Sequence, residues 1–447
     1  MGTVSACFFM EMESIHCNMY YLNPAPWAPG YFTEKNHWRQ SFEPKLMIWK
    51  SINIFHSNIT KLYAFSFLQM TLFPMAIITL FWKDHIGLSL TEILLLQGIL
   101  SVVMVVMEYP SGYISDRIGY RVSLTLAALL GMAGWGIYTV AGSFLHVMAA
   151  ETLIGISLAF ISGSDSALLY ETLRQGGSEQ QYARHQGRMS GFAQGGEALG
   201  AVFAGVIYAY APLLPFVLQI GVWFLALLLT RSLIEPPRDI APHSGHLKEA
   251  LRTVQYAFVE NKSLRYTILL NSALGLASFY PVWLIQPYMQ HAGVPVTWFG
   301  PVWSGANLTV AFFSLTSHRA NDFLGDRFMV LLFLILIGAG YAGLGTIGGL
   351  WGFLFYYLLT SMRGLRGPMM LNLTQKECPS ANRAGILSLQ SLCFRLLFVC
   401  TGPLVGMLAD RNGVTEAFRY LLYAFLLVLP PLVFLFFRSL PKENQGV

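Results

Sequence analysis

Charged residues are scarce in this chain of 447 residues, in which Asp, Glu, Lys and Arg together make up 11%. Soluble domains carry about 25% charged residues, so this chain has too few to cover a soluble surface of its size. Hydrophobic residues make up 55%, and mean hydropathy is +0.52. The composition therefore predicts an integral membrane protein whose partners include the lipid bilayer.

Residue patterns for metal binding, disulfides and nucleotide hydrolysis are also missing. The five cysteines have no metal-ligand spacing, so we expect neither a disulfide framework nor a metal site. No Gly-x-x-x-x-Gly-Lys-Ser/Thr loop is present, so ATP does not drive the protein directly. Neither a nucleophile elbow nor a cluster of His, Asp and Glu indicates an enzyme, and no cofactor is expected.

Long apolar runs are what the chain has in abundance. A membrane span needs about 20 apolar residues. The run at 266–317 contains no charged residue and is too long for one span, so it splits near 291–295. Twelve spans follow, at 59–82, 91–115, 122–140, 145–173, 186–210, 213–232, 266–291, 295–317, 328–347, 350–366, 384–409 and 417–437.

The distribution of basic residues predicts the orientation. One set of loops holds most of the Arg and Lys, whereas the opposite loops hold only Lys83, Arg411 and Arg419 nearby. Because cytoplasmic loops are enriched in basic residues, both termini are expected in the cytoplasm. The net charge of +5 then belongs to these loops, and no nucleic-acid partner is expected.

The chain divides into five predicted segments. Residues 1–46 have no spanning run and no signal-peptide pattern, so we expect a poorly ordered extension or a mis-called start, with Met47 as the alternative first residue. An amphipathic cytoplasmic arm is the other interpretation of this segment. Two bundles follow at 47–233 and 263–440, joined by a polar cytoplasmic linker at 234–262 and followed by a cytoplasmic tail at 441–447.

A ten-residue link at 112–121 joins two of the apolar runs and is too short to cross a membrane. It contains Gly112, Asp116, Arg117, Gly119 and Arg121, and it resembles the loop between helices 2 and 3 of the major facilitator superfamily, written G-x-x-x-D-R-x-G-R-[RK]. The match is incomplete, because a Tyr stands where the family often has the second Arg. The resemblance implies a gating loop between helices that change partners during transport.

The two bundles also repeat each other. A shift of 206 residues places Asp116 on Asp322 and Gly119 on Gly325, so the second half carries a decayed copy of the loop. The resemblance, which covers residues 47–440, implies an all-α membrane protein: twelve transmembrane helices in two six-helix pseudo-symmetric halves. Such a fold works by rocking its halves around a site near the middle of the membrane.

Ionisable residues inside a span cost about 2.5–3.5 kcal/mol, so each one needs a reason. A shift of 198 residues places Glu197 on Arg395, near the middle of equivalent helices. We predict that both line a central cavity; the alternative is that each is tied within its own half.

Three other intramembrane carboxylates have weaker claims to function. Asp165 is a candidate gate or proton site, with a helix tie as the alternative. Glu108 is grouped with the gating loop. A structural role is favoured for it, in which its carboxylate accepts hydrogen bonds from the nearby turn or from a neighbouring helix end. Glu151 is interpreted as a solvated carboxylate near the outer face that needs no function.

Tyr280, Trp283 and Gln286 lie on the seventh span and could contact a flat or amphipathic solute. Together these features predict a secondary active transporter of small organic solutes, coupled to protons. Efflux is slightly favoured because the seventh span is rich in aromatic residues and few buried cations are expected. A proton-coupled importer of a metabolite or siderophore, or a non-transporting membrane sensor, are the alternatives. We expect a monomer in a bacterial inner membrane.

Overall fold

Helices account for the whole regular structure of the described part of the chain. The computed structural model describes residues 43–237, 252–378 and 383–440, and no β-strand occurs among them. The predictions for residues 1–42, for residues 238–251 of the linker and for the tail at 441–447 lie outside the described residues.

The N-terminal half contains α2 (Glu43–Met70), α3 (Ile78–Leu80), η2 (Phe81–Ile86), α4 (Leu90–Ile118), α5 (Tyr120–Tyr138), α6 (Phe144–Gln175), η3 (Glu179–Gln181), α7 (Tyr182–Val202), α8 (Ala204–Tyr210) and α9 (Leu214–Arg231). The C-terminal half contains η4 (Tyr256–Glu260), α11 (Lys262–His291), η5 (Val296–Trp298), α12 (Phe299–Thr346), η6 (Gly352–Phe355), α13 (Tyr356–Lys376), α14 (Arg383–Asn412) and α15 (Val414–Ser439).

The helices of the described residues are consistent with the predicted twelve membrane spans. Eight helical segments of the described residues are long and apolar enough to cross a membrane. One of them holds α12, which has 48 residues and a non-helical backbone at Gly325, so it contains two spans. The helix pairs α2–α3 and α7–α8, together with α13, occupy the three remaining predicted positions.

Two predicted spans are interrupted rather than continuous. The span predicted at 59–82 leaves the α-helix after Met70 and resumes at Ile78. Pro74 lies in this break, and a proline cannot donate the backbone hydrogen bond that a helix interior requires. The span predicted at 186–210 breaks at Phe203, between α7 and α8. Helix α2 also begins at Glu43, so it crosses the predicted boundary between residues 46 and 47.

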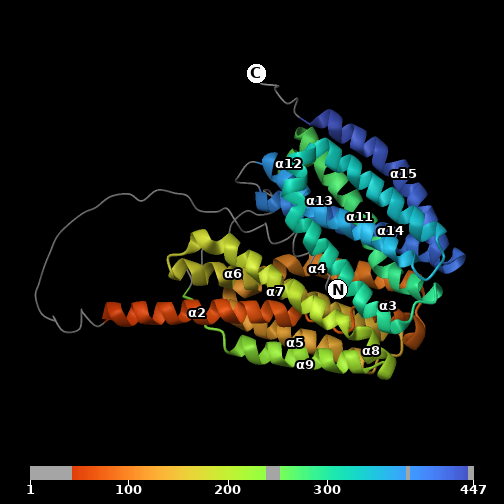
Figure 1. Cartoon of the computed structure of the whole chain (residues 1–447). Coiled ribbons are helices and arrows are strands. Elements are labelled where there is room, and N and C mark those ends of the chain that lie inside the picture. The colour runs from red at the N-terminus through yellow and green to blue at the C-terminus, as the bar shows by residue number, and fades with distance from the viewer. Residues whose placement is uncertain (1–42, 238–251, 379–382, 441–447) are drawn as a thin grey trace, which may run out of the picture.

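The two halves contact each other mainly where α4 packs on α14 and α7 packs on α12. Smaller contacts join α3 to α11, and α8 to η5 and α12. The backbones of the first pair approach closely, because a Cβ added at Gly406 would lie 2.5 Å from the Cα of Thr91. Figure 1 shows the two bundles meeting near α3 and α8 and splaying apart toward the start of α2 and the end of α15.

Candidate functional site

One end of the molecule is closed by hydrogen bonds between the halves. We call the end that holds η2, the start of α4, η5 and the end of α14 the sealed side, and the opposite end, with the α4–α5 turn, the basic side. At the sealed side, Gln286 of α11 donates to the carbonyl of Met75 at 2.9 Å and accepts from the amides of Thr79 at 3.0 Å and Leu80 at 3.4 Å. Its side chain therefore satisfies backbone groups that the break in the first span leaves unpaired.

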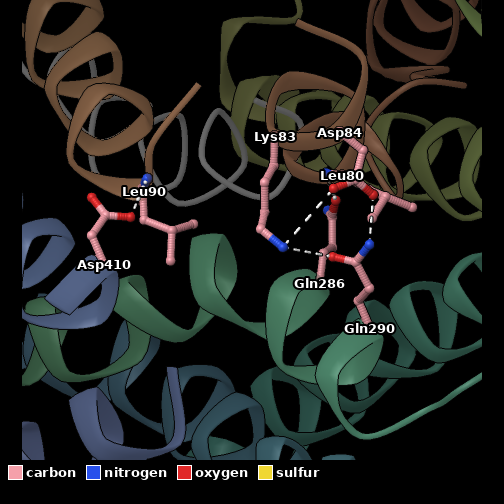
Figure 2. A network of polar contacts seen from close by, with 7 residues as sticks. All are labelled: Leu80, Lys83, Asp84, Leu90, Gln286, Gln290 and Asp410. Atoms are coloured by element: carbon pink, nitrogen blue, oxygen red, sulfur yellow. Dashed lines mark hydrogen bonds and ion pairs between the residues drawn. The ribbon is translucent and has the colours of Figure 1, made fainter. Parts of the chain in front are cut away.

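Gln290 extends this contact by one helical turn. Its amide oxygen accepts from Lys83 at 3.0 Å, and its amide nitrogen donates to Asp84 at 2.5 Å. Figure 2 shows Lys83 and Asp84 on one half facing Gln286 and Gln290 on the other. Gln286 thus links the halves at the sealed side, and its predicted contact with the solute stays a prediction.

Asp410 closes the sealed side at a second place. Its carboxylate accepts from the backbone amide of Leu90 at 2.8 Å (Figure 2). It also accepts from the backbone amide of Thr91 at 2.8 Å and from the Thr91 hydroxyl at 2.6 Å. These amides are at the start of α4, where the first turn leaves donors without helical partners. Asp410, at the end of α14, therefore caps a helix of the opposite half.

Glu197 lies midway along the span formed by α7 and α8, at the contact with α12. Its side chain is 0% exposed. Oε1 accepts from Asn307 at 2.8 Å and from the Trp303 indole at 3.4 Å. Oε2 is buried and has no hydrogen-bond partner among the described residues. Both donors belong to α12, so the hydrogen bonds of this carboxylate join the two halves.

Glu197 and Arg395 each interact electrostatically with an oppositely charged residue of the other half. Arg363 of α13 is the arginine that attracts Glu197 electrostatically. Arg395 attracts Glu108 of α4, which also accepts a hydrogen bond from Ser388. Both predicted residues are buried near the contact between the halves. Their membership of one cavity remains a prediction.

Buried charges are segregated between the two halves. The fully buried carboxylates among the described residues, Glu151, Asp165 and Glu197, all lie in the N-terminal half. The buried guanidinium groups of the described residues all lie in the C-terminal half, on Arg363, Arg366 and Arg395. Electrostatic attraction between buried groups thus acts across the contact between the halves.

The interpretation of Glu151 as a solvated carboxylate is wrong. Glu151 is 0% exposed, accepts from the Tyr138 hydroxyl, and accepts from Gln97 at 3.3 Å. These residues come from α6, α5 and α4 of the same half. These three helices pack on one another, and this packing cannot be read from the order of residues alone. Asp165, by contrast, accepts from the backbone and hydroxyl of Ser166, and its gate role stays a prediction.

The predicted aromatic residues of α11 face different neighbours. Tyr280 shares a hydrogen bond of 2.5 Å with the hydroxyl of Thr401 in its own half. Trp283 stacks on Trp82 of the opposite half, with ring centroids 5.9 Å apart. Trp283 therefore belongs to the contact between the halves. A role for either residue in solute binding remains a prediction.

The α4–α5 turn is held by the last residues of its own half. The carboxylate of Glu235 accepts from the amides of Tyr120 at 2.8 Å and Arg121 at 2.7 Å, which caps the start of α5. Arg121 donates to the carbonyl of Arg231 at 2.7 Å. Gly119 has φ +108, and a Cβ there would lie 3.0 Å from the Glu235 carboxylate. Glycine is therefore required by both conformation and space.

The other predicted loop residues are more exposed. Asp116 accepts from the Tyr120 hydroxyl at 3.4 Å, and the Arg117 guanidinium lies 4.4 Å from the centre of the Tyr113 ring. Gly112 has open space around its Cα. These contacts are local to the α4–α5 turn.

Several residues of these contacts are missing from the sequence prediction. Asn307 is a polar residue in the charge-free run at 266–317, which is a signal that could have found it. Glu235 falls in the predicted linker, and Asp410 ends an apolar run beside Arg411. Their partners are 110, 115 and 320 residues away, so no local pattern identifies the pairs.

A helical membrane protein with two similar halves, sealed at one end and joined by buried hydrogen bonds, has the features of a solute carrier. The comparisons agree, because the model of the Major Facilitator Superfamily matches residues 61–399. The chain belongs to this superfamily, which confirms the family, the all-α fold of two halves and a transporter rather than an enzyme.

Two relatives are similar in sequence. The "Uncharacterized MFS-type transporter YxaM" of Bacillus subtilis (strain 168) is 20% identical over 414 residues, which cover 86% of this chain and 97% of the relative. The "Probable 4-methylmuconolactone transporter" of Cupriavidus pinatubonensis is 29% identical over 141 residues, 31% of this chain and 30% of the relative.

Solved structures are similar in fold. A bacterial homologue of the human lysosomal transporter Spinster, inward-facing and unoccupied, has a TM-score of 0.69 at 15% identity, covering 87% of this chain and 96% of that one. A point mutant of the nucleoside transporter NupG has a TM-score of 0.73 at 13% identity, covering 86% of this chain and 100% of that one. At these identities the likeness supports the fold alone.

Proposed function

We propose that this protein is a proton-coupled secondary active transporter in which Glu197 binds the coupling proton. The observation that carries this proposal is that a fully buried carboxylate hydrogen-bonds only to α12 of the opposite half and leaves Oε2 without a partner among the described residues. An ionised carboxylate with an unsatisfied buried oxygen is costly, and a proton on that oxygen removes the charge.

Protonation of Glu197 would act on the movement of the halves. Its hydrogen bonds to Asn307 and Trp303 cross the α7–α12 contact, so they must break or change when the halves rock. A group whose partners differ between two states binds its proton with different affinity in each, and the proton then shifts the balance between the states. This linkage is what proton coupling requires.

Orientation, location and assembly belong to the same proposal. The basic side would face the cytoplasm, because its loops carry most of the Arg and Lys, and both termini would lie there. The sealed side would then face outward, and the arrangement would be closed to the outside. We propose a bacterial inner membrane and a monomer.

The direction of transport is where we depart from the sequence interpretation. The sequence interpretation favours efflux in part because it expects few buried cationic side chains. That expectation is wrong, because Arg363, Arg366 and Arg395 are each at most 4% exposed. Buried guanidinium groups suit an anionic metabolite, which favours the import alternative. A non-transporting sensor has less support, because the relatives are named as transporters.

The test uses the full chain in proteoliposomes that contain a pH-sensitive dye. A panel of neutral, cationic and anionic solutes is added outside, and lumenal pH is followed. We expect at least one solute to move protons in the parent protein and none in Glu197→Gln, while Glu151→Gln keeps the response. If Glu197→Gln moves protons at the parent rate, the assignment is wrong.

A further inference from the structure

The break in the first span is buried, and its backbone groups depend on side chains from elsewhere. Residues 71–77 leave the α-helix between α2 and α3, and Pro74 lies among them. Met75, Ala76 and Ile77 are 0% exposed, so protein groups rather than water must satisfy the backbone here. Two glutamine side chains do so, and they come from different halves.

Before Pro74, the chain is held by its own half. Gln219 of α9 accepts a hydrogen bond from the amide of Phe73 at 3.0 Å. Helix α7 packs directly on the same stretch, because a Cβ added at Gly200 would lie 2.6 Å from the amide nitrogen of Leu72. Both contacts stay inside the N-terminal half. The chain up to Phe73 is therefore fixed to the body of that half.

After Pro74, hydrogen bonds hold the chain to the opposite half. Gln286 of α11 bonds to the carbonyl of Met75 at 2.9 Å and to the amides of Thr79 and Leu80 at 3.0 and 3.4 Å. One turn further along α11, Gln290 bonds to the two charged side chains at the start of η2 (Figure 2). All of these bonds cross between the halves, so the partner of the chain changes at Pro74.

Ring contacts attach the chain beyond Pro74 to its own half. Phe81 packs on Phe216 of α9 with ring centroids 4.3 Å apart, and Trp82 stacks on Tyr138 of α5 at 6.3 Å. Apolar packing is less directional than a hydrogen bond, so rings can slide over one another while they stay in contact. The hydrogen bonds to α11 therefore define the position of this stretch more closely than its contacts with its own half.

We propose that residues 71–77 form a hinge and that residues 78–86, which we call the gate segment, move separately from the rest of the N-terminal half. Gln286 is the latch that holds the gate segment in place. Hinges are short stretches at the ends of helices that absorb changes in backbone angles, and Pro74 has already removed a helical hydrogen bond from this one. The gate segment ends at Gly87, where φ is +84.

The hinge predicts movement inside one half, which rocking of rigid halves excludes. Because the gate segment is hydrogen-bonded to the opposite half, its position relative to α2 should change when those bonds break. This inference goes beyond the proposed function and needs neither a solute nor a proton gradient for its test. A failure of proton coupling would therefore leave it untouched.

The experiment measures distances between pairs of spin labels by pulsed EPR in the detergent-purified full chain, with native cysteines replaced by serine. The pair Thr60→Cys and His85→Cys crosses the hinge, and both positions are exposed. The pair Thr60→Cys and Val140→Cys joins the same two sides of the same half without crossing it. In Gln286→Met, the first distance should shift by about 5 Å or more, one helical turn, while the second stays unchanged.

A third pair reports how far the halves separate at the sealed side. It joins Val140→Cys to Leu350→Cys, an exposed position that follows α12 at the sealed side. If this distance lengthens in Gln286→Met while the distance across the hinge stays constant, the half moves as a rigid body and the proposal is overturned. Equal shifts in both distances within the N-terminal half would also overturn it. If no distance changes, Gln286 is not a latch and the proposal fails.

The matched control is Gln219→Met, the same change on the other side of Pro74. It leaves the amide of Phe73 without its acceptor, so the melting temperature should fall, but the distance across the hinge should equal that of the parent. A shift as large as that in Gln286→Met would contradict the assignment of the latch.

A second variant covers the case in which Gln286→Met does not fold. Gln290→Met removes the bonds to Lys83 and Asp84 from a half-buried position, so it should disturb folding less. The distance from Thr60→Cys to His85→Cys should again shift, while the distance from Thr60→Cys to Val140→Cys stays unchanged. An unchanged distance across the hinge in this variant would overturn the proposal.

Discussion

Glu151 and Glu197 are both completely buried carboxylates of the N-terminal half, yet they are bonded in opposite ways. Glu151 accepts from Tyr138 and Gln97, which belong to its own half. Glu197 accepts from Asn307 and Trp303, which belong to the other half. The first set of bonds can persist while the halves rock as rigid bodies, whereas the second cannot.

The same distinction applies at two other carboxylates. Glu235 caps α5 within the N-terminal half, and Asp410 caps α4 from the C-terminal half. Bonds inside a half should therefore determine how stable the fold is. Bonds between halves should determine which conformation is populated and how it responds to solute. Each of the following variants tests one side of this distinction.

The largest effect on stability is expected for Glu151→Ala. The substitution leaves the Tyr138 hydroxyl and the Gln97 amide buried without their partner, and each unsatisfied group costs about 1–3 kcal/mol. The melting temperature of the detergent-purified protein should fall, while transport per folded molecule should persist. A folded variant with the melting temperature of the parent would show that the hydrogen bonds of Glu151 do not stabilise the fold.

A smaller effect, on conformation rather than on stability, is expected for Asp410→Asn. The neutral amide weakens a charge-assisted cap on Leu90 and Thr91, and hydrogen bonds to a charged group are worth about 1.5–3 kcal/mol. The sealed side should therefore open more often. Labelling of Thr79→Cys by an impermeant maleimide should become roughly tenfold faster, a change of about 1.4 kcal/mol.

The control for that measurement is Asp322→Asn, because Asp322 is an exposed carboxylate of α12 that pairs with His318 and lies close in sequence to the non-helical backbone at Gly325. When Asp322→Asn is combined with Thr79→Cys, the cysteine should be labelled at the same rate as in Thr79→Cys alone. An unchanged rate in Asp410→Asn would mean that the cap does not hold the sealed side closed. The native cysteines are replaced by serine in all of these variants.

The smallest difference is expected between two glycines at equivalent turns. Gly119 and Gly325 both have positive φ, at +108 and +76, so alanine at either position is strained by about 1–3 kcal/mol. A Cβ at Gly119 also displaces the Glu235 cap, whereas a Cβ at Gly325 meets nothing within 4 Å. Gly119→Ala should therefore lower the melting temperature further than Gly325→Ala. Equal shifts would show that the cap adds no stability.

Sequence reasoning predicted the fold well because the length of an apolar run is a local signal. The spans follow from runs of about 20 apolar residues. The two-half repeat follows from the shift of 206 residues that places Asp116 on Asp322 and Gly119 on Gly325. The breaks at Pro74 and Phe203 were not predicted as interruptions. At the first break, a distant side chain satisfies backbone groups that the helix leaves unpaired. Gln286 supplies this satisfaction at the first break from 211 positions along the chain.

The candidate site was predicted only in part. Burial of Glu197 and Arg395 follows from their position inside apolar runs, and both are buried. Their electrostatic partners, Arg363 and Glu108, depend on how the halves pack. A shift along the sequence matches equivalent positions of the repeat, but it carries no information about contacts between the two halves.

The central claim is that Glu197 couples proton binding to the movement of the halves and that Glu151 does not. The most direct measurement compares pH-gradient-driven uptake with solute counterflow, in proteoliposomes of Glu197→Gln and Glu151→Gln, using the solute found in the proton-movement assay. Glu197→Gln should lose gradient-driven uptake and keep counterflow, because exchange does not require the proton site to unload. Glu151→Gln should keep both. Gradient-driven uptake at the parent level in Glu197→Gln, or its selective loss in Glu151→Gln, would contradict the account.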